Sequence, residues 1–533
     1  MSKLLAVGLC AIFVAGCGET DPNKPGYWVG KLTSKRIQER IEAANRLRKF
    51  KDIQDAPKVA ALLKDDDPRV KEAAAEAVGE FGDKSQVPAL IDAIDYTVGA
   101  STDRESRAIN EANKQIAIAL SELGDKRATP ALLKLTRSHE TYVRLEAVRA
   151  LGQLRDPAAL DTLMDIATDE NTEPFIAKKA VIALGWIGDP KAVPAIERML
   201  FKERKGISFY PESSFAVFEI GDAATTPLLE LLDGRDKAME TWAQENHILP
   251  EALFAKTAQV LGDIGDPRAT KGLISKLNYT GGDYQLLVRS AAAESLGRMR
   301  VKEAAEPIAK LMNEDEANIR EAYGRALVMI GDPKVLPQMV AAAQKGSWDA
   351  REATIHAISN LGGAKELADV QKIADGEQAR WLKECTGNDN AAEDCQKVWP
   401  KHKDILDQHL ARLKAAAECR DNQTCWLGKL KDPAGPVRER AAWELGRTGK
   451  PDAIQPLLAA LQDDFLAARY AECLSLGWLL ESEGGKPQIK QADERVREIL
   501  TSDEGKTYYI RVDEDLKRLA TRLEKTMSKS EKA

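Results

Sequence analysis

Hydrophobic residues recur along most of this chain with helical spacing, in pairs of short segments. The stretch 143–167 shows the pattern most clearly and reads VRLEAVRALGQLRDPAALDTLMDIA. Its apolar positions lie three or four residues apart on both sides of a break at Arg155-Asp156-Pro157. They are Val143, Ala147, Leu151 and Leu154 before the break, and Leu160, Leu163, Met164 and Ala167 after it. This spacing predicts two amphipathic helices joined by a tight turn. Because one hairpin cannot cover its own apolar face, we expect further hairpins to stack on it.

The same hairpin pattern returns about every 31–33 residues, apart from three insertions. A small residue in the pattern x-x-A-[small]-x-[IL]-G-D-[PK] marks each copy. The clearest markers are Gly79, Gly152, Gly185, Gly262, Gly297, Gly446 and Gly477. A period of this length is typical of solenoids. The sequence therefore predicts an all-α fold, an α-solenoid superhelix of about twelve helical hairpins.

The turn inside each hairpin has a recurring chemistry. Gly-Asp-Pro stands at 188–190, 265–267 and 331–333, and a second proline follows the small residue by nine or ten positions, as at Pro194 and Pro337. Asp accepts hydrogen bonds from the free N–H groups at a helix start, and proline is tolerated in the first helical turn. We therefore expect the second proline to begin the second helix of each hairpin.

These units resemble HEAT-like repeats of the short bacterial type, known as PBS-lyase HEAT-like repeats. The resemblance covers roughly residues 35–480, and four segments carry it. They are VRLEAVRALGQLRDPAAL (143–160), KKAVIALGWIGDPKAVPAI (178–196), VRSAAAESLG (288–297) and VRERAAWELG (437–446). The resemblance implies that the basic residue eight positions before each small residue, such as Arg144 or Arg438, pairs with Asp groups of the turns in a ladder along the stack.

The first residues have the features of an export signal. Lys3 precedes an apolar run from Leu4 to Val14, which ends in Val14-Ala15-Gly16-Cys17. The run is too short to span a bilayer as a helix. The tetrapeptide resembles a bacterial lipobox, which implies cleavage before Cys17 and lipidation of its thiol; the alternative is an ordinary secretory signal. Gly18 replaces the Asp of an inner-membrane retention signal, which favours the outer membrane. We expect a lipid-anchored protein of the bacterial cell envelope, on the periplasmic or surface face.

These features divide the chain into seven expected segments. In order they are a signal peptide (1–16), the lipidated Cys and a tether (17–34), the repeat solenoid (35–374), a cysteine-containing helical insertion (375–434), further repeats (435–480), C-terminal capping helices (481–526) and a disordered tail (527–533).

Composition narrows the range of partners. Hydrophobic residues make up 44% of the chain but aromatic ones only 5%, which suits an Ala- and Leu-rich helical array. The formal net charge of −7 argues against a nucleic-acid partner.

Insertions in a solenoid project from one edge, where partners often bind. Five aromatic residues near the second insertion, which lies at about 233–246, are candidates for partner binding: Phe209, Tyr210, Trp242, Tyr279 and Tyr284. The alternative is that they cover an irregular junction.

The third insertion holds four of the seven cysteines, Cys385, Cys395, Cys419 and Cys425. An even set in an exported protein predicts two disulfides, for which three connectivities are possible. We favour Cys385–Cys395 with Cys419–Cys425, because each closes a short polar loop. The second pair requires a helix break at 420–423, since six helical residues span about 9 Å and a disulfide needs Cα atoms within about 7 Å.

A zinc site is an alternative use of part of this segment. Cys395, His402, His409 and Cys419 are close in sequence, and zinc accepts two Cys with two His. The spacing fits no known zinc finger, however, and the expected compartment is oxidising. We therefore expect neither a metal nor another cofactor.

The sequence favours a membrane-anchored, protein-binding scaffold or adaptor for a protein or peptide partner in the cell envelope. No nucleophile–base pair, phosphate loop or metal motif is found in the sequence, so we expect no catalysis. The alternative function belongs to another class: a bilin-lyase-like or other enzyme-associated HEAT protein that acts on a small-molecule ligand. Bilin lyases attach tetrapyrroles to cysteines.

Overall fold

The computed structural model describes residues 21–313, 316–388, 391–502 and 510–532. The chain is an all-α solenoid, as predicted, with one short β-hairpin. It divides into two compact units, one ending at Ala216 (unit 1) and one beginning at Val217 (unit 2). Among the described helices, none has both the length and the apolar character needed to cross a membrane. The predicted signal peptide and Cys17 lie outside the described residues.

Unit 1 alternates long and short helices. Its elements are α1 (Pro25–Lys31), α2 (Ile37–Phe50), α3 (Ala56–Ala60), α4 (Pro68–Phe81), α5 (Val87–Asp92), α6 (Arg104–Leu123), α7 (Thr129–Leu135), α8 (Thr141–Leu154), α9 (Leu160–Thr168), α10 (Pro174–Ile187), α11 (Val193–Met199), β1 (Glu203–Arg204) and β2 (Ile207–Ser208). Helix α12 (Tyr210–Ile220) runs across the boundary between the units. It begins one residue before Pro211, so this proline stands in a first turn and interrupts no helix.

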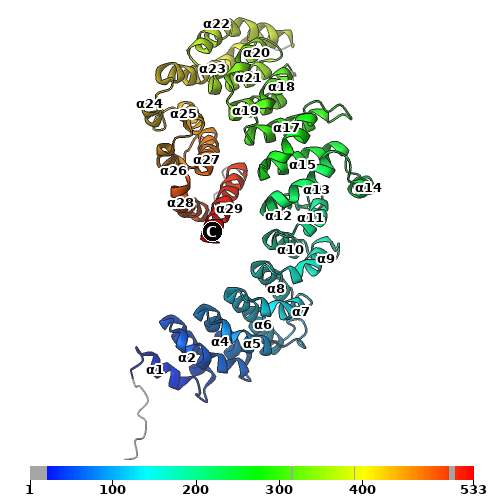
Figure 1. Cartoon of the computed structure of the whole chain (residues 1–533), viewed down its shortest axis with the longest axis vertical. Helices are drawn as coiled ribbons and strands as arrows, with labels where there is room; N and C mark the ends of the chain where they lie inside the picture. Colours follow the sequence, from blue (N-terminus) through cyan, green and yellow to red (C-terminus); the bar gives the residue numbers. More distant parts are fainter. Residues whose placement is uncertain (1–20, 314–315, 389–390, 503–509, 533) are drawn as a thin grey trace, which may run out of the picture. The chain divides into compact units, whose positions relative to one another are not determined.

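Unit 2 continues the alternation and adds two long helices, α22 and α23. Its helices are α13 (Thr225–Leu232), α14 (Lys237–Glu245), α15 (Pro250–Ile264), α16 (Thr270–Lys276), α17 (Gln285–Arg298), α18 (Ala305–Leu311), α19 (Ala317–Ile330), α20 (Leu336–Ala342), α21 (Trp348–Leu361), α22 (Ala364–Gly387), α23 (Ala392–Cys419), α24 (Gln423–Lys429), α25 (Gly435–Thr448), α26 (Ile454–Ala460), α27 (Leu466–Glu481), α28 (Ile489–Ser502) and α29 (Ile510–Lys532). The first helices of successive hairpins, such as α15, α17, α19 and α21, lie side by side (Figure 1).

The turn inside each hairpin has the predicted chemistry. The Asp156 side chain accepts a hydrogen bond from the backbone N–H of Ala158, and Asp189 and Asp332 cap the corresponding turns in the same way. Pro194 and Pro337 lie in the first turns of α11 and α20, as expected. Each turn is a short 3₁₀ helix, so the two helices of a hairpin are joined without a loose loop.

The recurring small residue marks the place where neighbouring first helices touch. A Cβ atom added to Gly152 in α8 would lie 2.6 Å from the Cβ of Ala183 in α10. Gly297 in α17 approaches Ala326 in α19 similarly, at 2.7 Å from its Cα. The period seen in the sequence is therefore the period of these close helix contacts.

We expect Gly152→Ala to lower the free energy of unfolding by about 1–3 kcal/mol, because the added methyl group overpacks the contact with Ala183. Urea denaturation followed by circular dichroism measures the effect. Gly376→Ala in α22 is the matched control: no atom lies within 4 Å of the added Cβ, and alanine favours a helix by up to about 1 kcal/mol over glycine. Equal stability of the two variants would contradict the assignment.

The basic ladder connects neighbouring hairpins at several joints. Arg40 contacts Asp65 at 2.6 Å, Arg438 contacts Asp463 at 2.6 Å, and Arg144 contacts Glu173 at 2.6 Å. Each acidic partner lies in the connection between hairpins, whereas the Asp inside the hairpin caps its own turn. The ladder therefore stabilises the joints of the stack.

In the third insertion, disulfide bonds join Cys385 to Cys395 and Cys419 to Cys425, with Cα–Cα distances of 5.9 and 5.3 Å. Helix α23 ends at Cys419, and Arg420 has a φ of 48°. The chain therefore turns between α23 and α24, which lets Cys425 reach back to Cys419.

Candidate functional site

A pocket of about 240 Å³ opens between four first helices of unit 2, α19, α21, α25 and α27. Insertion helix α23 packs against both α21 and α25, and α25 also contacts α21 directly. Because α23 bridges α21 and α25, residues far apart in sequence meet around one cavity. The lining residues are Glu321, Arg325, Val328, Ala353, His356, Ala357, Asn360, Glu439, Trp443, Leu466, Ala467 and Tyr470, and we refer to this cavity as the four-helix pocket.

An imidazole and a carboxylate meet at one wall of the four-helix pocket. His356 Nε2 lies 3.3 Å from Glu439 Oε1. The His356 side chain is 28% exposed, whereas that of Glu439 is only 4% exposed. Because a carboxylate only accepts, Nε2 of a neutral His356 is the donor and Nδ1 has the free lone pair. The pair therefore has the form of a base oriented by a buried carboxylate.

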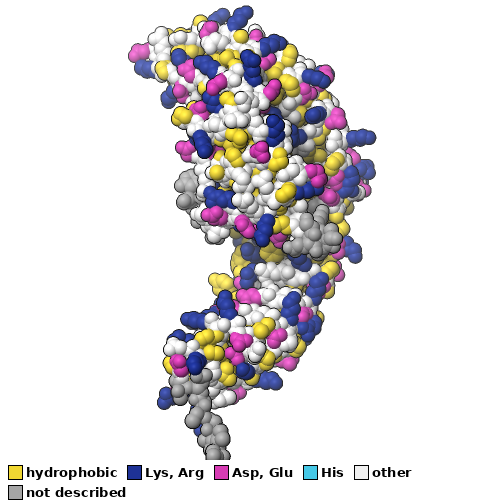
Figure 2. Space-filling view, turned by 60° about the vertical axis from the view of Figure 1, so that its left-hand side comes forward, with side chains coloured by type: hydrophobic (Ala, Val, Ile, Leu, Met, Phe, Trp, Pro, Cys, Tyr) yellow, Lys and Arg dark blue, Asp and Glu magenta, His cyan; other side chains and the backbone are white. Residues whose placement is uncertain are grey.

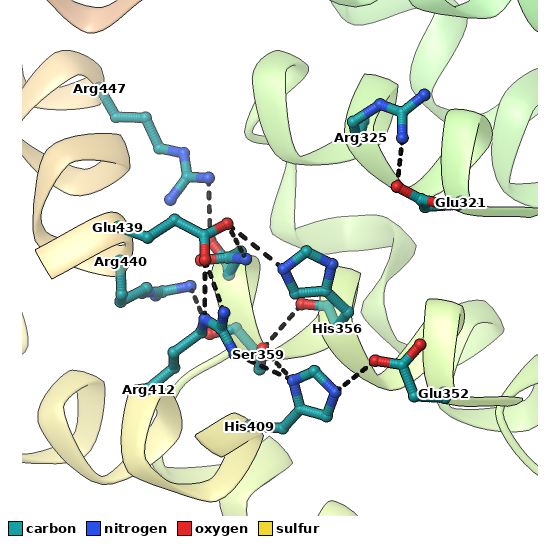
Figure 3. Close-up of polar contacts among 11 residues, drawn as sticks. Glu321, Arg325, Glu352, His356, Ser359, His409, Arg412, Glu439, Arg440 and Arg447 are labelled. Atoms are coloured by element: carbon teal, nitrogen blue, oxygen red, sulfur yellow. Dashed lines mark hydrogen bonds and ion pairs between the residues drawn. The ribbon is translucent and has the colours of Figure 1, made fainter. Parts of the chain in front are cut away.

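Glu439 is held by several donors at once (Figure 3). Arg412 donates to Glu439 Oε2 from Nη2 at 2.6 Å and from Nε at 3.1 Å, and Asn360 donates to Oε1 at 2.9 Å. Burial alone would raise the pKa of Glu439, but the Arg412 charge and the hydrogen bonds from His356 and Arg412 outweigh it and hold this pKa well below its usual value. Glu439 is therefore ionised at neutral pH.

A second histidine extends the network behind Glu439. Arg412 Nη1 donates to His409 Nδ1 at 3.0 Å, so the proton of His409 stands on Nε2, which lies 2.8 Å from Glu352 Oε1. Burial lowers the pKa of His409 to about 4, although the hydrogen bond to Glu352 opposes the shift. His409 is therefore neutral at pH 7 and fixes the position of Arg412.

The rest of the four-helix pocket combines apolar and charged groups. Trp443 and Tyr470 have ring centroids 6.1 Å apart, in an edge-to-face arrangement. Arg325 forms an ion pair with Glu321 in α19. Arg447 donates to the carbonyl oxygens of Val328 at 2.8 Å and Asn360 at 2.9 Å, which ties α25 to α19 and α21. Such a cavity suits an organic molecule with both apolar and polar parts.

These groups can move protons. A neutral imidazole oriented by a carboxylate is the usual general base of proteins. Among the described residues, no group of three His, Cys, Asp or Glu side chains is placed to hold a metal ion. Two of the residues considered for zinc, Cys395 and Cys419, form disulfides, and His402 packs between Trp348 and Trp381 with ring centroids 4.4 and 4.3 Å apart.

The five aromatic candidates for partner binding differ in exposure. Phe209 is completely buried, with Arg204 over its ring at 5.2 Å, and offers no surface to a partner. Tyr284 is 56% exposed, whereas Tyr210, Trp242 and Tyr279 are half-buried. Tyr279 packs on Phe254. A partner-binding role for these four residues stays a prediction.

The surface carries charges of both signs. On the face shown in Figure 2, Lys and Arg side chains are interspersed with Asp and Glu, with apolar groups between them. A mixed surface of this kind produces no extended field of one sign on that face.

The four-helix pocket could not be recognised from contiguous motifs, because its residues are far apart in the sequence. His356 and Glu439 are 83 positions apart, and the insertion separates them. One signal was present in the sequence. In four units the residue directly after the ladder arginine is Glu321, Glu352, Glu439 or Tyr470. Glu321, Glu439 and Tyr470 line the four-helix pocket, and Glu352 belongs to the network behind it. An acidic residue that recurs directly after a structural arginine indicates that these units share a polar surface.

Comparison with protein families identifies the repeats over much of the chain. A family model described as HEAT repeats matches residues 29–110, 107–174, 129–207, 305–385 and 426–507, which together exceed half of the chain. A family model described as PBS lyase HEAT-like repeat matches residues 288–314, which include most of α17.

Among curated proteins, the chain is similar to phycocyanobilin lyase subunit alpha from Picosynechococcus sp. The two are 27% identical over 134 residues, which cover 22% of this chain and 49% of the relative. The chain thus spans about half the length of this relative. This similarity to a lyase subunit contradicts our expectation of a chain without catalysis. That expectation relied on motifs that are contiguous in the sequence.

Solved structures with a similar fold include two helical-repeat assemblies. The complex of CpcE and CpcF of phycocyanin lyase from Nostoc sp. is 17% identical, with a TM-score of 0.25, and the match covers 61% of this chain and all of that one. A chain of the Kap95:Nup1 complex is 13% identical, with a TM-score of 0.41, and the match covers 90% of this chain and 69% of that one. These likenesses concern the fold alone.

Proposed function

The chain belongs to the HEAT-repeat family, and from this premise we propose that it is a lyase-like protein that holds a small organic molecule in the four-helix pocket. The observation that carries the proposal is the His356–Glu439 pair at the pocket wall. Addition and elimination reactions require a proton acceptor and donor at the reacting atom. The sequence similarity to a phycocyanobilin lyase subunit supports this class of reaction over others.

The ligand class follows from the size and lining of the four-helix pocket. Its volume of about 240 Å³ lies just below the usual range of about 300–1,000 Å³ for ligand sites, so it takes a small organic molecule or one end of a larger one. Trp443 and Tyr470 offer aromatic faces to a conjugated ring. A linear tetrapyrrole, bound by one terminal ring, is the candidate that the similarity supports.

We expect the full chain to bind phycocyanobilin and to accelerate its addition to a small thiol such as N-acetylcysteine. His356→Gln retains the hydrogen bond to Glu439 but cannot accept a proton, so we expect binding within a few-fold of the wild type and an adduct rate about 10²–10⁴-fold lower. Absorbance of the chromophore measures both quantities. His139→Gln is the matched control, because His139 is exposed in unit 1.

Two results would reject this function. One is the absence of any absorbance change when phycocyanobilin is titrated into the wild-type chain. The other is a His356→Gln variant that forms the adduct as fast as the His139→Gln control.

The location and partner of the protein belong to the same proposal. We propose that Cys17 is lipidated and anchors the chain in the bacterial cell envelope, at the outer membrane. We further propose that a protein or peptide partner in this compartment receives or presents the ligand. The resemblance of Val14-Ala15-Gly16-Cys17 to a lipobox and the extended surfaces of a repeat array support these statements.

A further inference from the structure

A second cavity, of about 260 Å³, lies in unit 2 where the last helix, α29, packs against the stack. Residues of α15, α17, α27 and α29, with Arg300 just after α17, line it. Its lining residues do not overlap with those of the four-helix pocket. We refer to it as the α29 cavity.

Helix α29 contacts the stack through two kinds of side chain. Its apolar stripe, Leu516, Leu519, Ala520 and Leu523, is buried. Its polar side reaches elements about 220–260 positions earlier: Asp515 pairs with Arg298 at 2.8 Å, and Arg522 donates to the carbonyl oxygen of Asp263 at 2.6 Å. The α29 cavity is therefore enclosed by residues from both ends of unit 2.

Four arginines and three carboxylates line the α29 cavity. Arg298 and Arg518 contact Asp263 and Asp515, and Arg522 contacts Glu481 at 3.3 Å. Among the described residues, Arg300 is the lining arginine with no carboxylate within 4 Å. The lining groups therefore carry one positive charge in excess.

The position of Arg300 leaves its guanidinium N–H groups available to donate hydrogen bonds to a ligand. Its guanidinium carbon lies 4.8 Å from the centroid of the Trp478 ring. Stacking on tryptophan uses the face of the guanidinium, while the N–H groups at its edge can still bind two oxygens of one anion. Burial and the nearby charge of Arg447 lower the pKa of Arg300, and the charge of Glu481 opposes this shift. An added anion would oppose it further.

A second donor is available on α29 itself. Arg518 lines the cavity, and its Nη1 lies 3.6 Å from carboxylate oxygens of Glu514 and Asp515, which is long for an ion pair. A ligand oxygen near Nη1 would give this group a closer partner.

From these observations we propose that the α29 cavity binds a small organic oxyanion, a carboxylate or a phosphate ester, through Arg300 with Trp478 and through Arg518 of α29. The volume suits a molecule of the size of benzoate or phenyl phosphate. Because Arg300 follows α17 and Arg518 belongs to α29, the bound anion stabilises the packing of α29. The proposal uses no residue of the four-helix pocket and is independent of the lyase-like function.

Isothermal titration calorimetry of the full chain with benzoate and with phenyl phosphate, at constant chloride, tests the proposal. We expect at least one of the two probes to bind, and the stronger of them identifies the anion as carboxylate or phosphate. Arg300→Ala weakens binding about tenfold or more, and Arg300→Lys weakens it less, because lysine keeps the charge but lacks the planar fork. Arg36→Ala, which removes an 83% exposed arginine of unit 1, leaves affinity unchanged.

Hydrogen exchange gives a second readout. The better probe slows exchange in α29 of the wild type and not in Arg300→Ala. Three results would overturn the proposal: neither probe binds at millimolar concentration, Arg300→Ala binds as tightly as Arg36→Ala, or binding leaves exchange in α29 unchanged. If circular dichroism shows that Arg300→Ala is unfolded, the comparison of Arg300→Lys with Arg36→Ala decides.

Discussion

Replacement of Arg412 by methionine is expected to lower the free energy of unfolding by about 3–5 kcal/mol. Arg412 and Glu439 are 3% and 4% exposed, and Arg412 donates two hydrogen bonds to the Glu439 carboxylate, at 2.6 and 3.1 Å. Without Arg412 the carboxylate remains buried with only His356 and Asn360 as partners. Urea denaturation of the full chain, followed by tryptophan fluorescence, measures the loss.

The double variant Arg412→Met/Glu439→Met distinguishes the cause. Removal of both charges eliminates the unpaired carboxylate, so we expect the double variant to recover most of the lost stability. Arg495→Met is the matched control for an exposed pair: Glu498, its partner at 2.7 Å, is 66% exposed, and the expected effect is below about 1 kcal/mol. A double variant as unstable as Arg412→Met would mean that lost packing, rather than the buried charge, causes the effect.

Glu472→Gln is expected to stabilise the protein at pH 8 by about 5 kcal/mol and to have little effect near pH 4. Glu472 in α27 is fully buried, and it lies beside the carboxyl group of Asp463. Burial, together with the charge of Asp463, raises the pKa of Glu472 from 4.5 to about 9. The folded state therefore holds this proton far more tightly than the unfolded chain does.

The sign of the pH dependence follows from this shift. The contribution of the protonated Glu472 to stability is fully present below the unfolded pKa of about 4.5 and is lost as the pH rises through about 9. Glutamine has no proton to lose, so this part of the pH dependence disappears in the variant. Denaturation at pH 4.5, 6.5 and 8 measures it, with Glu483→Gln as the control because the Glu483 side chain is 90% exposed. Identical pH profiles for Glu472→Gln and Glu483→Gln would refute the assignment.

Much of the fold could be predicted because its determinants are local. The small residue of each unit, the Asp of the turn and the second proline act within one hairpin or between neighbours. Gly152, Asp156 and Pro194 accordingly have the roles expected from their spacing. The ladder was expected too, but its acidic partners lie between hairpins, as with Asp65 and Arg40. The sequence does not show which turn the arginine side chain reaches, because this depends on how neighbouring hairpins pack in three dimensions.

The four-helix pocket could not be predicted in the same way. His356 lacks any neighbour in sequence that marks it as a base, and Glu439 lies beyond the insertion formed by α22, α23 and α24. The search for contiguous motifs led to the wrong expectation of no catalysis. The two polar groups become a pair only because α21, α23 and α25 contact one another in the folded chain.

The sequence by itself determined the repeating helical hairpin, its turn and the contact between neighbouring first helices, since 3.6-residue periodicity and close packing at small residues operate over a few tens of residues. Only the tertiary structure decided which side chains of distant hairpins share a cavity. Small packing differences at each joint accumulate along a stack, and an insertion changes which hairpins become neighbours. The pairing of His356 with Glu439 and the placement of Arg300 beside α29 depend on that accumulated geometry.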